Sequence, residues 1–267
     1  MSSQSTFLPL PARRIACDGD VQLIATDIAV ETPIAIEFDG IGYAVMMATP
    51  ADLEDFVRGF VVSERLIARH EALLSIDVAT VSSGCIVRAR LPANRRQAVI
   101  ERARARVSES SCGLCGLESL EQVARPLPRA ANGPAIADAA IFRAIGGLRD
   151  FQPLNARTGA VHASAFCGAD GTILMLREDV GRHNALDKLI GAMLVAGIDP
   201  ASGFLLTTSR CSYEMVEKSV LAGTATLVGI SAATSLAVDR ARTAGLRLVA
   251  LARDDSLLDM HPQAGSV

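Results

Sequence analysis

Residues 161–208 read VHASAFCGADGTILMLREDVGRHNALDKLIGAMLVAGIDPASGFLLTT, and this stretch decides the fold. Val161–Cys167 and Thr172–Leu176 predict a β-hairpin that turns at Gly168–Gly171. Apolar spacing predicts a helix over Arg182–Ala196, and Phe204–Thr208 predicts the next strand. The alternation of helices and strands continues at Tyr213–Gly223, Thr226–Ile230, Thr234–Ala244 and Leu246–Leu251. Strands separated by helices of this length predict an α/β domain of three layers, with helices on both sides of a mixed sheet.

Upstream of residue 108, the chain predicts a smaller α+β unit. Asp39-Gly40 marks a tight turn between strands at Ile34–Phe38 and Tyr43–Ala48. Thr49 is placed to cap the helix that follows, and Pro50 suits its first turn. Two further strands and a basic helix are predicted at Leu74–Val81, Cys85–Leu91 and Pro92–Val107.

These patterns divide the chain into three segments. Residues 1–107 are predicted to form the smaller N-terminal α+β domain, and residues 135–267 the larger α/β domain, which opens with a helix at Ile136–Leu148. Residues 108–134 lie between them. Ser108–Gly116 is rich in Ser, Gly and Cys and predicts a surface loop, and Arg125–Pro134 is typical of a linker.

Composition limits the class of protein. Of the 267 residues, 50% are hydrophobic and 21% are charged, which is typical of a globular protein. The net charge of -3 gives no general attraction to polyanions, so we expect no nucleic-acid partner. We find no signal-peptide pattern, and the apolar stretch Leu189–Ile198 is far shorter than the ~20 residues of a membrane span. We therefore expect a cytoplasmic protein with no membrane partner and with six reduced cysteines.

Cys112 and Cys115 are the first candidate site, in the run Ser-Ser-Cys-Gly-Leu-Cys-Gly. Two thiols at this spacing can bind a metal ion, form a redox disulfide, or act as nucleophile and resolving thiol for a carried sulfur atom. The spacing alone does not choose among these functions. A structural zinc site normally needs four ligands, and no second C-x2-C or H-x3-H follows, so we assign no metal ligand.

Arg182 and His183 are the second candidates, in the run REDVGRHNALDK of residues 177–188. This run leaves a strand and enters a helix, where free backbone N–H groups favour anions. In an α/β sheet, ligands bind at this end of the strands. The alternative is that Glu178, Asp179 and Arg182 only cap and pair on the surface.

Two hydroxyl-rich runs, Thr207–Ser212 and Ser231–Ser235, each lie between a strand and the next helix. Their hydroxyl and amide groups can hold a phosphate or a purine edge, with Arg210 adding a positive charge. The candidates are Ser209, Arg210, Ser231 and Thr234. The competing interpretation is that Ser212 and Thr234 cap their helices, and that Cys211 is packed.

His162 and the cysteine pair superficially suggest a zinc-dependent deaminase. Those enzymes need H-x-E followed by P-C-x-x-C. Here Ser164 stands where the Glu would be, and the cysteine pair precedes the histidine. The general acid/base residue is missing, so we interpret His162 as a structural residue.

Taken together, these motifs resemble the FdhD/NarQ family of formate dehydrogenase accessory sulfurtransferases. The resemblance covers nearly the whole chain, and the combination of EDVGRHNA and SCGLCG is highly specific. The matching runs, in chain order, are ETPIAIEFDG, TPADLEDFVRGFVVSERLI, SSCGLCG, TGAVHASAF, EDVGRHNALDKLIG, SRCSYEMVEKS and SAATSLAV.

The resemblance implies a cytidine-deaminase-like α/β domain without deaminase chemistry, a smaller N-terminal domain and a homodimer. It also implies a sulfurtransferase that accepts persulfide sulfur from a cysteine desulfurase. The sulfur then passes to the bis-molybdopterin guanine dinucleotide molybdenum cofactor, which the formate dehydrogenase catalytic subunit requires. By position, Cys112 would carry the persulfide and Cys115 would assist transfer or resolution. The alternative function is a non-catalytic zinc- or nucleotide-binding chaperone for a molybdoenzyme.

The family binds its cofactor at a turn near the C-terminus, and this chain departs from the family pattern there. The corresponding residues are Leu251, Ala252, Arg253, Asp254, Asp255 and Ser256. Arg253 can pair with a phosphate, whereas Asp254 and Asp255 place negative charge beside an anionic ligand.

Overall fold

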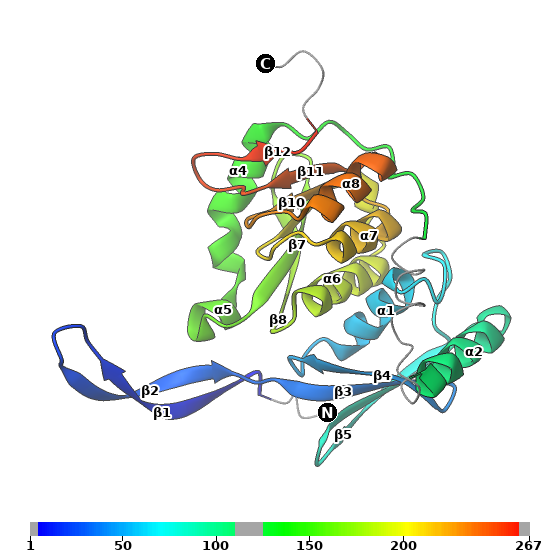
Figure 1. The fold of residues 1–267 in the computed structure, drawn as a ribbon, viewed down its shortest axis with the longest axis horizontal. Coiled ribbons are helices and arrows are strands. Elements are labelled where there is room, and N and C mark those ends of the chain that lie inside the picture. Colours follow the sequence, from blue (N-terminus) through cyan, green and yellow to red (C-terminus); the bar gives the residue numbers. More distant parts are fainter. Residues whose placement is uncertain (1–4, 110–124, 262–267) are drawn as a thin grey trace.

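The computed structural model describes residues 5–109 and 125–261, and its largest element is a six-stranded sheet (Figure 1). The strand order is β12-β11-β10-β9-β7-β8. Strands β9, β10 and β11 run parallel, while β7 and β12 are antiparallel to their neighbours. The strands are β7 (His162–Gly168), β8 (Ile173–Asp179), β9 (Gly203–Thr207), β10 (Thr226–Gly229), β11 (Arg247–Ala250) and β12 (Leu258–Asp259). The predicted α/β class with a mixed sheet is confirmed.

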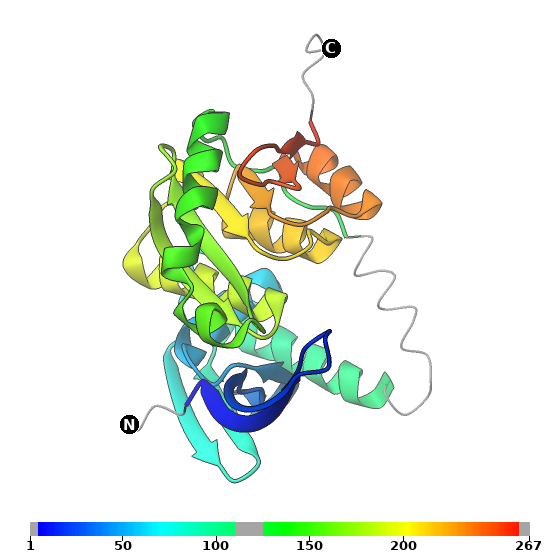
Figure 2. The same ribbon diagram turned by 90° about the vertical axis from the view of Figure 1, so that its left-hand side faces the viewer.

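Helices cover both faces of this sheet, as Figures 1 and 2 show. Alternate residues of each strand point to opposite faces, so Leu205 packs on one helical layer and Phe204 and Leu206 on the other. The first layer holds α6 (Arg182–Ala196), α7 (Tyr213–Ala222) and α8 (Ser235–Ala244). The second holds α4 (Asp138–Gly147), which leads into the short helices η1 (Leu148–Phe151) and α5 (Pro153–Thr158). The short helix η2 (Pro200–Ser202) precedes β9. The likeness to cytidine deaminases stays a prediction.

The N-terminal part contains a four-stranded sheet in the order β4-β3-β6-β5. Its turn at Asp39-Gly40 has φ of 49° and 83°, as the predicted hairpin requires. Its core is aromatic and aliphatic, and includes Phe38, Phe56 and Phe60. The elements are β3 (Thr32–Phe38), β4 (Ile41–Ala48), α1 (Leu53–Ser63), β5 (Ser75–Val81), β6 (Gly84–Arg90) and α2 (Ala93–Glu109).

A separate two-stranded arm precedes this sheet and extends away from it (Figure 1). It consists of β1 (Phe7–Ile15) and β2 (Val21–Ala29), paired antiparallel. The sequence does not predict β1, because Pro9 and Pro11 interrupt it and proline cannot donate to a strand ladder.

Helices α1 and α6 pack so closely that glycines are required at their contact. A Cβ atom on Gly59 would lie 1.8 Å from the Asp187 carbonyl oxygen, and one on Gly191 would lie 1.9 Å from that of Asp55. The N-terminal part is thus joined to the larger domain by direct contact between the backbones of α1 and α6. No helix in the described ranges has the length and apolarity to cross a bilayer.

A buried ion pair lies beside this contact. Lys188 Nζ is 2.6 Å from Asp179 Oδ2, and both side chains are fully buried. The backbone of Thr49 bonds to both members of the pair: its N–H donates to Asp179 (3.0 Å) and its carbonyl accepts from Lys188 (2.9 Å). Asn184 adds a bond from its amide to Asp179 Oδ1 (3.0 Å). The interpretation of Asp179 as a surface residue is therefore wrong.

The predicted cap of α1 is also wrong. The helix begins at Leu53, and its N-cap position is taken by Asp52, which has φ of 53° and makes no side-chain cap. Thr49 is buried and instead accepts the N–H of Val180 on its hydroxyl (3.2 Å). Thr49 thus joins distant parts of the chain, a contact that local sequence signals do not reveal.

We expect Gly59→Ala to lower the free energy of unfolding by about 2 kcal/mol or more, because its Cβ would force α1 and α6 apart. The matched control is Gly146→Ala in α4, where an added Cβ meets nothing within 4 Å and alanine favours the helix. Urea unfolding of both variants measures the difference. Equal stability of the two variants would contradict the proposed close contact.

Candidate functional site

The carboxyl ends of β9, β10 and β11 meet at one edge of the large sheet. We call this the carboxyl edge and define it by residues 208–212, 230–234 and 251–256. Backbone hydrogen bonds join the three segments, with Cys211 N donating to Ala232 O (3.0 Å) and Leu251 N to Ser231 O (3.1 Å). The structure thus brings together the runs that the sequence placed after separate strands.

The start of α6 reaches the same edge because β7 runs antiparallel to β9. His162, at the beginning of β7, pairs with Asp179, the last residue of β8. The backbone N–H of Thr208 donates to Ala163 O (3.0 Å), which fixes the end of β9 beside the beginning of β7. Arg182 follows three residues after Asp179, so the helix opens next to the carboxyl edge.

The hydroxyl groups at this edge differ in how far they are free to bind a ligand. Ser209 is buried, and its hydroxyl lies 3.0 Å from that of Thr207 and donates to Arg210 O (3.2 Å). Thr234 caps α8 as predicted, accepting the N–H of Ala237 at 3.4 Å. Arg210 is exposed and has no ion-pair partner in the described part of the chain. Arg210 therefore offers an open guanidinium to an anion at this edge.

Ser212 also occupies an N-cap position, that of α7, but makes no capping hydrogen bond. Its hydroxyl lies 3.3 Å from Glu214 Oε2 instead. Ser212 therefore has the predicted position, but the predicted capping hydrogen bond is absent.

The turn after β11 presents four exposed residues at the carboxyl edge, Arg253, Asp254, Asp255 and Ser256. Its entry is fixed by Leu251, at φ of 48°, and by the buried Ala252, whose N–H donates to Gly229 O (3.1 Å). The turn closes with Arg253 N donating to Ser256 O (2.8 Å). Arg253, the one cation of this turn, is therefore followed by two exposed carboxylates, those of Asp254 and Asp255.

Arg182 and His183 face different neighbours at the start of α6. His183 Nε2 lies 3.0 Å from Glu214 Oε2 on α7, and this contact lowers the pKa of Glu214. The Nε atom of Arg182 is buried and has no hydrogen-bond partner among the described residues. Arg182 also lowers the pKa of His162, although burial of the imidazole is the larger cause. Arg182 thus retains a donor without a partner among the described residues.

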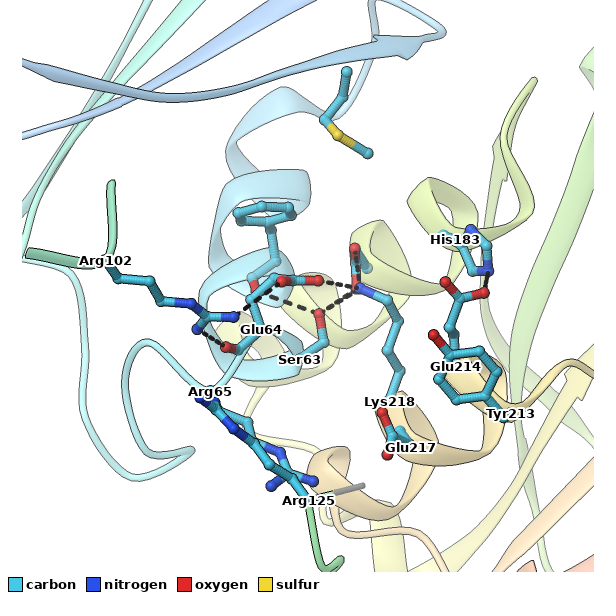
Figure 3. Close-up of a pocket in the computed structure, with 13 residues that line it drawn as sticks. Ser63, Glu64, Arg65, Arg102, Arg125, His183, Tyr213, Glu214, Glu217 and Lys218 are labelled. Atoms are coloured by element: carbon cyan, nitrogen blue, oxygen red, sulfur yellow. Dashed lines mark hydrogen bonds and ion pairs between the residues drawn. The ribbon is translucent and has the colours of Figure 1, made fainter. Parts of the chain in front are cut away.

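A pocket of about 350 Å³ opens between α1, α2, α6 and α7 (Figure 3). His183 connects it to the start of α6. The pocket has an unusually charged lining, formed by Met46, Phe60, Ser63, Glu64, Arg65, Arg102, Arg125, His183, Asp187, Tyr213, Glu214, Glu217 and Lys218.

A buried cluster forms the floor of this pocket. Lys218 Nζ lies 2.9 Å from Asp187 Oδ2 and donates to Ser63 Oγ at 2.8 Å. The Ser63 hydroxyl in turn donates to Asp187 Oδ1 at 2.6 Å. Burial is the largest single influence and favours the neutral amine, but the carboxylates of Asp187, Glu64 and Glu214 together outweigh it, so the pKa of Lys218 is raised. Lys218 is therefore a charged, fully engaged group.

The mouth of the pocket is richer in arginine. Arg65 and Arg125 have no carboxylate within ion-pair distance in the part of the chain that is described. Burial lowers the pKa of Arg65, and the guanidinium of Arg125 adds to this effect while Glu217 opposes it. Figure 3 shows Arg65 and Arg125 next to one another, whereas Arg102 points to Glu64, to whose backbone carbonyl it donates (2.8 Å). This arrangement favours an anion at the mouth.

The predicted reactive cysteines, Cys112 and Cys115, lie outside the described residues. Among the cysteines that are described, Cys17 is exposed and the others are buried. Burial raises the pKa of the Cys211 thiol to about 12, which keeps it protonated and unreactive. The packed interpretation of Cys211 therefore agrees with its surroundings.

Sequence reasoning missed the pocket residues on α1, on α2, on α7 and just after α1, among them Ser63, Arg65 and Lys218. One signal was available, since Lys218 falls on the apolar side of its helix between Met215 and Ala222. A lysine in that position needs a buried partner. That partner, Asp187, is 31 positions away in the sequence, so the sequence alone does not identify it.

Comparisons with known proteins agree with these motifs. A family model described as the FdhD/NarQ family matches residues 29–260. A protein named sulfur carrier protein FdhD from Variovorax paradoxus is 44% identical over 236 residues, covering 88% of this chain and 85% of that protein. A protein of the same name from Xanthomonas euvesicatoria is 45% identical over 237 residues, covering 88% and 84%.

A solved structure shares the fold. The crystal structure of a protein from Desulfotalea psychrophila, described as a formate dehydrogenase accessory protein, has a TM-score of 0.75 and 22% identity, covering 97% of this chain and 98% of that one. The sequence match carries the assignment, and the chain belongs to the FdhD/NarQ family.

Proposed function

We propose that this chain is a sulfurtransferase of the cytoplasm, a homodimer that supplies sulfur to a molybdenum cofactor during formate dehydrogenase maturation. The observation that carries the proposal is the match to proteins named sulfur carriers over 88% of the chain. Within that match the chain keeps two thiols at C-x2-C spacing. Cys85, Cys167 and Cys211 are buried and unsuited to the reaction, and Cys17 lies outside the matched residues 29–260, so the pair are the best candidates.

The proposed loading step is an exchange between a persulfide and a thiolate. The Cys112 thiolate attacks the outer sulfur of a desulfurase persulfide, a new S–S bond forms, and the desulfurase cysteine leaves as a thiolate. Cys112 then carries the sulfur. Cys115 is the neighbouring thiol that assists its release, at a spacing that allows a disulfide between the two.

The cargo in this proposal is a bis-molybdopterin guanine dinucleotide, bound at the carboxyl edge. Its diphosphates match the exposed Arg210 and Arg253 and the start of α6, where Arg182 has an unused donor. Ser231 and Thr234 contribute backbone and hydroxyl groups, and Ser209 shapes the loop from within. The cytidine-deaminase-like layering would place this edge where α/β folds commonly bind ligands.

We expect Cys112→Ala to abolish activation of formate dehydrogenase while leaving the fold intact. The readout is intact mass after incubation with a cysteine desulfurase and cysteine, where the unaltered chain gains ~32 Da that reduction removes. Cys17→Ala is the control, because Cys17 is an exposed thiol outside residues 29–260, which match the family model. Bound zinc without a sulfur adduct would favour the zinc-binding chaperone instead.

GDP, which represents one nucleotide arm of the cargo, should bind more tightly than guanosine, because only GDP has charge for the arginines. Arg210→Ala should weaken GDP binding about tenfold. Arg143→Ala is the control, since Arg143 is exposed but bonds to Asp170 in the β7–β8 turn, at the opposite edge. Titration calorimetry measures each affinity. Guanosine binding as tightly as GDP would rule out the phosphate argument.

Arg182→Ala or His183→Ala should block sulfur delivery while Cys112 still becomes persulfidated. Both residues open a helix at the carboxyl edge, whereas loading needs only the thiol pair. The variants are loaded with sulfur, measured by mass, and then tested for activation of a sulfur-deficient dehydrogenase. Loss of the persulfide itself would show that the start of α6 supports loading, and the two-site scheme would be wrong.

A further inference from the structure

The arm formed by β1 and β2 carries an unusual amount of exposed apolar surface. Of the sixteen large apolar side chains that are exposed in the described residues, seven lie on it, although it spans only residues 7–29. Leu23 is 83% exposed, the highest value among the sixteen. The seven are Leu8, Leu10, Ile15, Val21, Leu23, Ile24 and Ile28.

The arm has little support from its own chain. Its base is held to α5 by an ion pair of Arg157 with Asp27 (3.0 Å), and Arg157 also lies 3.8 Å from the Phe7 ring centroid. Both contacts involve the same face of the hairpin, because Phe7 and Asp27 are two positions apart in the pairing register. The other face carries Leu8, Leu10, Ile24 and Ile28, all more than a third exposed. An isolated two-stranded hairpin is at best marginally stable in water.

We propose that the arm packs against a second copy of this chain and forms the main contact of the homodimer. This inference rests on the homodimer of the proposed function and identifies its surface.

The first argument for a second copy is area. The seven side chains, which lie on both faces of the hairpin, together expose on the order of 500 Å² of apolar surface, as much as the largest patch on an ordinary monomer, and a partner that wraps the arm would cover both faces. In a two-fold dimer each arm contributes the same surface, so about 1,000 Å² is buried in total, which reaches the size of a specific interface. A small ligand would leave most of the arm in water.

The second argument is charge. The end of the arm carries two cations, Arg13 and Arg14, and two anions, Asp18 and Asp20. None of the four has an ion-pair partner in the described part of the chain. A balanced set of unpaired charges gives no general attraction to an anionic membrane or to nucleic acid. It does suit a copy of itself, since a two-fold contact can place the arginines of one arm against the aspartates of the other.

The test is the molar mass of the full chain by light scattering during gel filtration, over a dilution series. The unaltered chain should have twice the 28.0 kDa of one copy. Leu10→Asp and Leu23→Asp, one on each face of the arm, should weaken the dimer at least tenfold, because each change enters the interface twice. Val195→Asp is the control, since Val195 is 64% exposed at the end of α6 and should leave the dimer unchanged.

Hydrogen exchange gives a second measurement that does not depend on a variant. Amides of β2 should be protected at high concentration and should exchange faster on dilution, while β10 stays protected throughout. A dimer unaffected by both arm variants would overturn the arm contact alone. If the unaltered chain is a monomer, both the arm contact and the proposed homodimer are wrong. Binding of the arm to another protein or to a lipid vesicle would not change that result. Persulfide formation on Cys112 would still test the sulfur chemistry separately.

Discussion

The buried pair of Asp179 and Lys188 is the interaction on which the rest of the structure depends. Both charges are removed from water, which is costly unless every polar atom is satisfied. Here the Thr49 backbone and the Asn184 amide supply the missing hydrogen bonds. The pair therefore fixes where β4 ends, how α1 approaches α6, and where α6 begins. Loss of either charge would leave the other buried and unpaired, at a cost of roughly 3–5 kcal/mol.

The same helix serves the interface and the candidate site. On α6, Asn184, Asp187 and Lys188 are buried against the N-terminal part, whereas Arg182 and His183 face the carboxyl edge and the pocket. Most of the run at residues 177–188 therefore holds the two parts of the protein together, and only the first turn of α6 is free to contact a ligand. A displacement of α1 would move the pocket floor as well, because Ser63 on α1 bonds to Asp187.

The sequence predicted most of the helices and strands because their signals are local. Helix α6 has the bounds that apolar spacing indicated, and Asp39-Gly40 forms the expected turn. The exceptions involve distant partners or conflicting local signals. Thr49 looks like a cap but binds a carboxylate 130 residues away, and β1 contains two prolines. The carboxyl edge followed from the order of strands, whereas the pocket did not, because its walls come from segments that the chain order keeps apart.

The separation of Thr49 from Asp179 also affects the order of events during synthesis. At 5–20 residues per second, the 130 positions between Thr49 and Asp179 take roughly 6 to 26 seconds to synthesise, so α1 leaves the ribosome that long before α6 can meet it. During that interval the apolar side of α1, with Phe56, Val57 and Phe60, can pack only on its own small sheet. The side of α1 that carries Gly59 has no partner until α6 has been synthesised. We therefore expect this surface to stay exposed on the nascent chain for longer than in a protein whose contacts are local.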